Sequence, residues 1–124
     1  MYTDILIVGA GVTGSALARV LSRYEGSLTV LDRGDDAAEG ASKANSGIVH
    51  SGYDAHNGTL KARFNIEGNR MMGDVCDELD VPFERIGSLT VCNDEKAIPE
   101  LEALKERGEK NGVEGLSILS REEL

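Results

Sequence analysis

Hydrophobic residues near the start of the chain follow three successive patterns, which predict a strand, a helix and a second strand. Residues 5–8 are an unbroken apolar run that ends at Gly9, typical of a parallel strand buried on both faces. From Val12 to Tyr24 apolar residues recur at helical spacing opposite polar ones, and Gly26 follows where a helix would end. Residues 28–32, Leu-Thr-Val-Leu-Asp, are predicted to form a second strand. This order predicts a right-handed parallel β-α-β unit.

A long polar segment and a second helix follow. Residues 33–58 are rich in Gly, Ser, Ala, Asn and Asp, and loops of this length without their own secondary structure are usually functional. Residues 59–79 have helical spacing, but Gly68 and Gly73 each cost about 1 kcal/mol relative to Ala within a helix. We therefore expect close packing of another backbone or a ligand against these glycines.

The rest of the chain predicts shorter elements. In order, they are a strand over residues 86–92, a charged helix that begins between Asp94 and Pro99 and ends at Asn111-Gly112, a strand over residues 116–119, and the first turn of another helix at residues 120–123.

Residues 9–14, Gly-Ala-Gly-Val-Thr-Gly, fit the pattern G-x-G-x-x-G. The pattern alone is weak, but here it follows a buried strand, opens a helix, and is followed by an acid, Asp32, at the end of the next strand. Gly9 allows a tight turn, Gly11 leaves room for a pyrophosphate, and Gly14 lets the helix pack on the strand. The combination predicts a dinucleotide site.

Main-chain N–H groups and the helix dipole would hold the pyrophosphate, with Val12 and Thr13 in the first turn. Asp32 would accept hydrogen bonds from ribose hydroxyls and repel a 2′-phosphate, which disfavours NADP; the neighbouring Arg33 softens that argument only slightly. The fingerprint itself does not separate NAD from FAD. The polar loop over residues 40–47, followed by residues 48–53, favours FAD, because NAD-type units usually continue into further β-α repeats.

Charge and cysteine content narrow the classes of function. The formal net charge of -9 argues against non-specific binding to nucleic acid or to an anionic membrane. Cys76 and Cys92 lack metal or redox-pair spacing, so we predict no metal site and two buried free thiols, which suit a cytoplasmic location. The sequence shows neither a signal peptide nor an apolar segment of about 18 residues, so no membrane span is expected.

These residues resemble the FAD-dependent oxidoreductases of the D-amino-acid oxidase/glycerol-3-phosphate dehydrogenase superfamily. The resemblance is closest to the branch with anaerobic-type glycerol-3-phosphate dehydrogenases and L-2-hydroxyglutarate oxidases. It rests on the fingerprint, on the acid at the end of the second strand, and most specifically on residues 45–53, Asn-Ser-Gly-Ile-Val-His-Ser-Gly-Tyr. Two positions depart from the pattern. Asp32 stands where Glu is more frequent, and Lys43-Ala44 precede the Asn where Arg is frequent in the glycerol-3-phosphate dehydrogenases.

The resemblance implies a role for each matching residue. Gly9, Gly11, Gly14 and Asp32 are implied as contacts of the ADP half of FAD. Ser42, Asn45, Ser46 and Gly47 are implied as the loop that passes the pyrophosphate and the flavin. His50 is implied beside the redox face of the flavin, where it would orient the substrate or take its hydroxyl proton; a histidine that only hydrogen-bonds the loop is an equal alternative. His56 is expected at the surface.

The expected fold class is α/β, a Rossmann-type FAD/NAD(P)-binding β-α-β unit followed by the start of an α+β substrate domain. The domain division implied is an incomplete FAD-binding portion at residues 1–81 and a truncated substrate domain at residues 82–124. The intact enzyme would oxidise a small substrate, a polyol phosphate or a 2-hydroxy acid, by hydride transfer to FAD. Oxygen, a quinone or a partner protein would then reoxidise the flavin.

Two alternatives remain open: an NAD-binding dehydrogenase domain, and a dinucleotide-binding module without catalysis of its own. The 124 residues alone are expected to be inactive. Unpaired strand edges in this piece predict self-association.

Overall fold

The computed structural model describes residues 2–123, and its chain falls into two compact units, residues 1–48 and 49–124. This structural division is based on packing, whereas the functional division at residue 81 stays a prediction.

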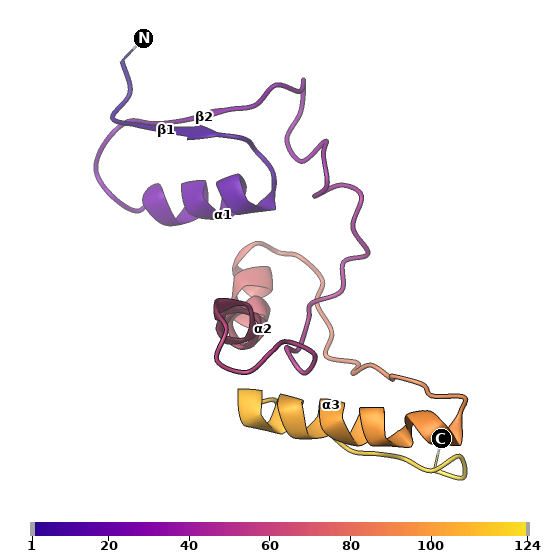
Figure 1. Cartoon of the computed structure of the whole chain (residues 1–124). Coiled ribbons are helices and arrows are strands. Elements are labelled where there is room, and N and C mark those ends of the chain that lie inside the picture. The colour runs from indigo at the N-terminus through magenta and orange to yellow at the C-terminus, as the bar shows by residue number, and fades with distance from the viewer. Residues whose placement is uncertain (1, 124) are drawn as a thin grey trace. The chain divides into compact units, whose positions relative to one another are not determined.

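The first unit is a β-α-β unit with two parallel strands (Figure 1). Its elements are β1 (Ile5–Val8), α1 (Val12–Leu21) and β2 (Leu28–Leu31). The strands pair in register from Ile5 opposite Leu28 to Val8 opposite Leu31. The helix ends three residues earlier than Tyr24, and Gly26 adopts a φ of 136° in the turn that leads to β2. The predicted parallel β-α-β order is confirmed.

Burial in this unit is confined to one face of the sheet. Side chains alternate between the two faces of a strand, so Ile7 points opposite to Leu6 and Val8. Ile7 is only 7% exposed and lies against α1, since a Cβ atom at Gly14 would be 3.3 Å from its Cγ2. Leu6 and Val8 are 52% and 77% exposed. The expectation that residues 5–8 are buried on both faces is wrong for the described residues, because one helix covers one face of two strands.

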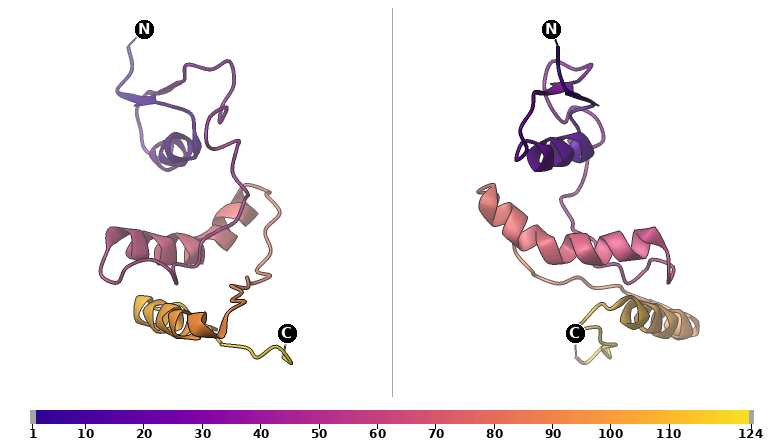
Figure 2. Two further views of the ribbon diagram at one scale, coloured as in Figure 1. Left: turned by 45° about the vertical axis from the view of Figure 1, so that its right-hand side comes forward. Right: turned by 90° about the vertical axis from the view of Figure 1, so that its left-hand side faces the viewer.

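The second unit contains α2 (Leu60–Glu78), the 3₁₀ turn η1 (Glu95–Ala97) and α3 (Ile98–Asn111). Both long helices were predicted, and Figure 2 shows them in two orientations. The Thr59 hydroxyl accepts a hydrogen bond from the Ala62 N–H at 3.2 Å and caps α2, while Pro99 lies in the first turn of α3.

After each long helix, one residue adopts a left-handed backbone conformation. This conformation allows the next N–H group to donate a hydrogen bond to one of the last carbonyls of the helix. At the end of α2 the Val81 N–H donates to the Cys76 carbonyl at 2.9 Å, and Asp80 adopts a φ of 54°. At the end of α3, Gly112 has a φ of 85°. These are Schellman motifs, which satisfy carbonyl groups that a helix leaves unpaired.

Two predicted strands are absent from the described residues, namely residues 86–92 and residues 116–119. Both segments are extended or irregular. Apolar alternation favours a strand only if a neighbouring strand pairs with it, and Ile86 and Leu89 are instead 85% and 69% exposed. The predicted helix start at residues 120–123 is a turn in which the Ser120 N–H donates to the Glu123 carboxylate at 2.8 Å.

The second unit is held by packing of α3 on the turn that precedes α2. Asn111 donates from its amide to the carbonyls of Gly52 and Ala55 at 3.0 and 2.7 Å, and Ala55 is 2% exposed. A Cβ atom at Gly108 would be 2.9 Å from the Cβ and 3.2 Å from the Cα of Tyr53. The absence of a side chain at Gly108 therefore allows the helix to approach the turn.

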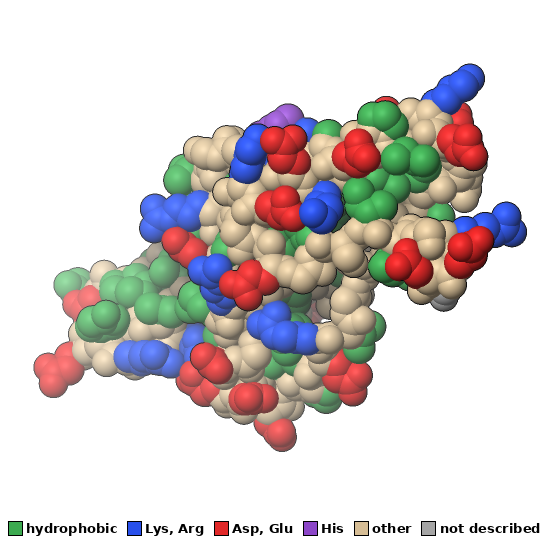
Figure 3. All heavy atoms as spheres, turned by 90° about the horizontal axis from the view of Figure 1, so that it is seen from below, with side chains coloured by type: hydrophobic (Ala, Val, Ile, Leu, Met, Phe, Trp, Pro, Cys, Tyr) green, Lys and Arg blue, Asp and Glu red, His purple; other side chains and the backbone are tan. Residues whose placement is uncertain are grey.

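Few apolar side chains are buried among the described residues. The apolar core consists of Ile7, Ala55, Ala62 and Cys76. Cys76 is buried as predicted, but Cys92 is half-buried, so the expectation of burial is wrong there; both thiols are free. Figure 3 shows apolar side chains at the surface, among interspersed acidic and basic ones. No helix within residues 2–123 has both the length and the apolar character that crossing a membrane requires.

Glycines in α2 and α3 provide a matched test of this packing. Gly108→Ala is expected to destabilise the protein by about 1–3 kcal/mol, because the new methyl group would lie 2.5 Å from Leu116 Cδ1 and 2.9 Å from the Cβ of Tyr53. Gly68 and Gly73 have no protein atom within 4 Å of a Cβ position, so the expectation of another backbone packed against them is wrong for the described residues, whereas a ligand at these glycines stays a prediction. Gly68→Ala should therefore stabilise by about 0.5–1 kcal/mol. Urea unfolding measures the change in the free energy of unfolding for both variants. A change of the same sign in both variants would contradict the packing.

Candidate functional site

The turn between β1 and α1 has a shape that glycine makes possible. Gly9 adopts a φ of 106°, and its N–H donates to the Leu31 carbonyl of β2 at 2.7 Å. A Cβ atom at Gly14 would fall on the carbonyl oxygen of Gly9. Since a left-handed residue and a side-chain-free helix face are both needed, these two glycines bring the N-terminus of α1 directly to the end of β1.

The N-terminus of α1 presents main-chain N–H groups next to this turn. The Val12 N–H donates to the Ser42 hydroxyl at 2.8 Å, and a Cβ atom at Gly11 would lie 3.1 Å from that same oxygen. Within residues 2–123, the N–H groups of Gly11, Thr13 and Gly14 have no acceptor. The first N–H groups of a helix lack intrahelical partners and carry the positive end of its dipole, so this end can bind an anion.

Asp32 follows β2 and lies beside the same turn. Its Oδ2 accepts from the Ala10 N–H at 2.6 Å, and its Oδ1 accepts from the Gly34 N–H at 2.9 Å. The hydrogen bond from Ala10, followed by that from Gly34, lowers the pKa of the Asp32 carboxyl, and the positive charge of Arg33 adds a smaller effect. Asp32 is thus a half-buried carboxylate that is ionised at neutral pH, while Arg33 is exposed.

The predicted loop over residues 40–47 reaches the turn through Ser42. The Asn45 amide donates to the Ser42 carbonyl, and the Gly47 N–H donates to Asn45 Oδ1 at 2.7 Å. Ser46 is exposed beside them. The structure therefore brings Gly9, Gly11, Gly14, Asp32 and Ser42 together around one turn, and it links Asn45 and Gly47 to that cluster through Ser42.

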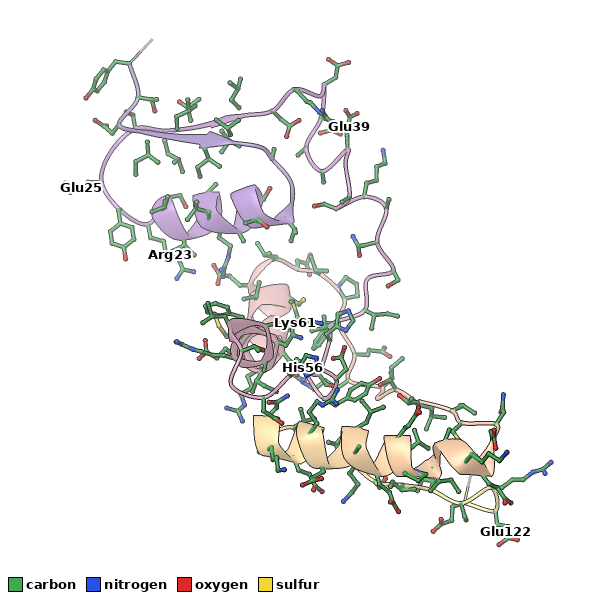
Figure 4. The ribbon with its side chains drawn as sticks, viewed as in Figure 1. Arg23, Glu25, Glu39, His56, Lys61 and Glu122 are labelled. Carbon is green, nitrogen blue, oxygen red and sulfur yellow. The ribbon has the colours of Figure 1, made fainter. Side chains whose placement is uncertain are left out.

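Two groups at this site have no signal in the sequence, namely the main chain of Ala10 and the carboxylate of Glu39. The Ala10 N–H holds Asp32, and the Ala10 carbonyl accepts from the N–H of Ala38, which has a φ of 62°. Glu39, labelled in Figure 4, is a side chain that the sequence interpretation missed. A Cβ atom at Gly34 would contact the Glu39 carboxylate and lie 3.4 Å from Asp32 Oδ1, so two carboxylates flank Gly34.

The two histidines both lie in the second unit. His50 is exposed, and its carbonyl accepts from the Asn69 amide at 3.2 Å. His56 is exposed on the turn before α2 (Figure 4), and its carbonyl accepts from the Thr59 hydroxyl at 2.7 Å. Within residues 2–123 no three His, Cys, Asp or Glu side chains are grouped to hold a metal ion.

The residues of the first unit fit the ADP half of a dinucleotide. Accessible N–H groups at a helix N-terminus suit a pyrophosphate, and no side chain at Gly11 blocks an approach to the backbone. An ionised carboxylate at the end of the adjacent strand suits ribose hydroxyls.

The position of Gly14 gives the sharpest mutational test of the turn. Gly14→Ala is expected to destabilise the first unit by about 1–3 kcal/mol, because a methyl group and the Gly9 carbonyl oxygen require the same space. Gly40→Ala is the control, since a Cβ atom at Gly40 has no neighbour within 4 Å. Thermal unfolding of both variants checks this, and a Gly14 variant as stable as the Gly40 variant would contradict the geometry.

The carboxylate of Asp32 predicts a pH dependence of stability. The pKa of the Asp32 carboxyl is lowered from its ordinary value of 3.8 when the protein folds, so the stabilising contribution of Asp32 is fully present above that value and is lost as pH falls through the folded pKa. Asp32→Asn removes the titrating group. The stability difference between wild type and Asp32→Asn, measured by urea unfolding from pH 7 down to pH 3, should shrink below about pH 4. A difference that stays constant over this range would exclude the predicted titration.

Comparisons with known proteins agree with this geometry. The sequence profile of the DAO family, described as FAD dependent oxidoreductase, matches residues 4–124. The glycerol 3-phosphate dehydrogenase of Caloramator mitchellensis is 45% identical over 121 residues, which are 98% of this chain and 25% of that protein. The mitochondrial L-2-hydroxyglutarate dehydrogenase of Homo sapiens is 36% identical over 123 residues, 98% of this chain and 27% of that protein.

A solved structure is also similar. Dithionite-reduced L-alpha-glycerophosphate oxidase from Mycoplasma pneumoniae with FAD bound matches with a TM-score of 0.85 and 34% identity, over 99% of this chain and 33% of that chain. The chain thus spans about a quarter to a third of the length of these relatives. The family's cofactor decides between the two dinucleotides in favour of FAD. The chain belongs to the DAO family of FAD-dependent oxidoreductases.

Proposed function

We propose that this chain is the FAD-binding opening part of an oxidoreductase that oxidises glycerol 3-phosphate or a 2-hydroxy acid. One observation carries the proposal: the Gly9–Gly14 turn leaves helix N–H groups accessible directly beside the ionised Asp32. The ADP half of FAD needs this pairing of anion-binding N–H groups with a carboxylate. Residues 82–124 would begin an α+β substrate domain.

The main chain of residues 11–14 would bind the pyrophosphate of FAD, with Val12 and Thr13 in the first helical turn. The Ser42 hydroxyl already accepts from the Val12 N–H, so Ser42 would lie next to the pyrophosphate. Its hydroxyl would donate to a phosphate oxygen, because a hydroxyl can accept and donate at once.

Asp32 would accept from the ribose hydroxyls with the lone pairs that Ala10 and Gly34 leave available. The carboxylate of Glu39 lies beside Gly34 and adds negative charge. Both carboxylates would repel a 2′-phosphate, and the exposed Arg33 reduces this repulsion only in part. This arrangement favours a dinucleotide without a 2′-phosphate, as FAD is.

The loop over residues 42–47 would continue along the pyrophosphate toward the flavin. The hydrogen bonds of Asn45 to Ser42 and Gly47 give this loop a defined course. Asn45, Ser46 and Gly47 are exposed, and the Ser46 hydroxyl, which does not take part in these hydrogen bonds, would be available to the cofactor. His50 follows Gly47 by three residues in the sequence.

His50 would take the hydroxyl proton of the substrate while the carbinol carbon loses its hydride and becomes a carbonyl carbon. Bound FAD supplies the hydride acceptor. Histidine is suited to this role because a neutral imidazole ring has a nitrogen lone pair that can accept a proton. Oxygen, a quinone or a partner protein would then reoxidise the cofactor by accepting two electrons.

The relatives support this substrate class. They divide between glycerol 3-phosphate and L-2-hydroxyglutarate, which are both secondary alcohols with anionic groups. Lys43-Ala44, before Asn45, differ from the pattern of the glycerol-3-phosphate dehydrogenases, so both substrates belong in the test.

The two histidines provide a matched pair for testing the reaction. The full-length polypeptide would be purified with FAD and mixed anaerobically with glycerol 3-phosphate or L-2-hydroxyglutarate, and bleaching of the flavin would be followed in a stopped-flow spectrometer. His50→Gln is expected to lower the limiting rate of flavin reduction by about 10²–10⁴-fold, because a general base is lost. His56→Gln should leave that rate unchanged. A colourless protein, or a flavin that neither substrate bleaches, would refute the proposed function.

A further inference from the structure

Asn69 of α2 joins two segments that are far apart in the sequence. Its amide Nδ2 donates to the carbonyl of His50 at 3.2 Å. Its Oδ1 accepts from Arg85 Nη1 at 2.8 Å, and its own carbonyl accepts from Arg85 Nη2 at 2.7 Å. Asn69 thus lies between the loop that carries His50 and the extended segment after α2.

Arg85 determines which way the Asn69 amide points. A guanidinium group only donates hydrogen bonds, so the amide atom that faces it must be the oxygen. The Asn69 NH₂ group is then left for the His50 carbonyl, which only accepts. The two hydrogen bonds of Arg85 bind both the side chain and the backbone of Asn69. The Arg85 guanidinium also lies 5.3 Å from the ring of Phe83.

A second contact holds the same two segments together. The Tyr53 hydroxyl is 2.9 Å from Thr90 Oγ1. Tyr53 follows His50 by three residues, and Thr90 follows Arg85 by five. The extended segment is therefore tied to the His50 loop at two points, one through Asn69 and one through Tyr53. Asn69 is half-buried, whereas His50 and Arg85 are exposed, so Asn69 is the more enclosed member of this chain of contacts.

We infer that Asn69 is a positioning residue for His50, and that Arg85 holds Asn69 in the orientation this requires. The Asn69 amide restrains the main chain at His50, and this restraint limits the directions in which the imidazole is presented. The kinetic part of this inference rests on the proposed function of His50. The restraint on the loop is independent of that function.

Asn69→Asp separates the two partners of Asn69. The new carboxylate keeps the size of the side chain and an acceptor for Arg85, so the helix and the contact to Arg85 are retained. It has no N–H to donate, and it places an oxygen against the His50 carbonyl. The variant should therefore release the His50 loop selectively. Asn93→Asp, which makes the same charge change at an exposed asparagine of this chain, is the control.

Two readouts on full-length protein with bound FAD would test the inference. Hydrogen–deuterium exchange with mass spectrometry should show faster exchange in peptides covering residues 49–53 in Asn69→Asp, and wild-type exchange in Asn93→Asp. The limiting rate of flavin reduction should fall by about 10–100-fold in Asn69→Asp, since a displacement of about 1 Å costs this much. The half-saturating substrate concentration and the FAD content should be unchanged, which a general loss of structure would not produce.

Any other result would contradict either the inference on Asn69 or the proposed function. Wild-type exchange at residues 49–53 in Asn69→Asp would overturn the inference, as would equal effects in Asn93→Asp. If wild-type flavin is not reduced by either substrate, the proposed function fails, and the exchange result still decides whether Asn69 restrains the loop. If Asn69→Asp does not fold, Arg85→Lys takes its place: loss of the two-pronged grip should raise exchange at residues 49–53, and unchanged exchange there would overturn the inference.

Discussion

The close approach of Gly14 to the carbonyl oxygen of Gly9 is the constraint on which the first unit depends. Because no side chain intervenes, α1 starts at the very end of β1 and covers Ile7. Its N-terminal N–H groups then lie beside the end of β2, where Asp32 accepts from the Ala10 N–H. A larger residue at position 14 would separate the helix from the strand, and the anion-binding end of the helix would no longer adjoin the carboxylate.

The sequence predicted the helices of this protein better than its strands. The hydrogen bonds of α2 and α3 are local, so helical spacing and the capping residues place them. Thr59 marks the start of α2, and Gly112 marks the end of α3. Residues 86–92 alternate as a strand does, but a strand requires a partner that the local sequence does not supply. The parallel pairing of β1 with β2 was predictable because a helix connects them at a standard spacing.

The candidate site was predictable where side chains, or their absence, define it. Gly9, Gly14 and Asp32 stand at fixed positions of a known pattern, and their geometry follows from the chain around them. The hydrogen bond of Ser42 to the Val12 N–H spans thirty residues, and no periodic pattern encodes such a loop contact. Asn69, unlike Ser42, was not predicted as a site residue at all, since a polar residue in a helix usually faces solvent. Only its contacts to His50 and Arg85 distinguish it from the other polar residues of α2.

A crystal structure of the full-length protein with FAD tests the central claim most directly. The account predicts that the pyrophosphate accepts hydrogen bonds from main-chain N–H groups of residues 11–14, and that a ribose hydroxyl donates to Asp32. A nucleotide bound elsewhere, or one whose ribose does not contact Asp32, would contradict the account.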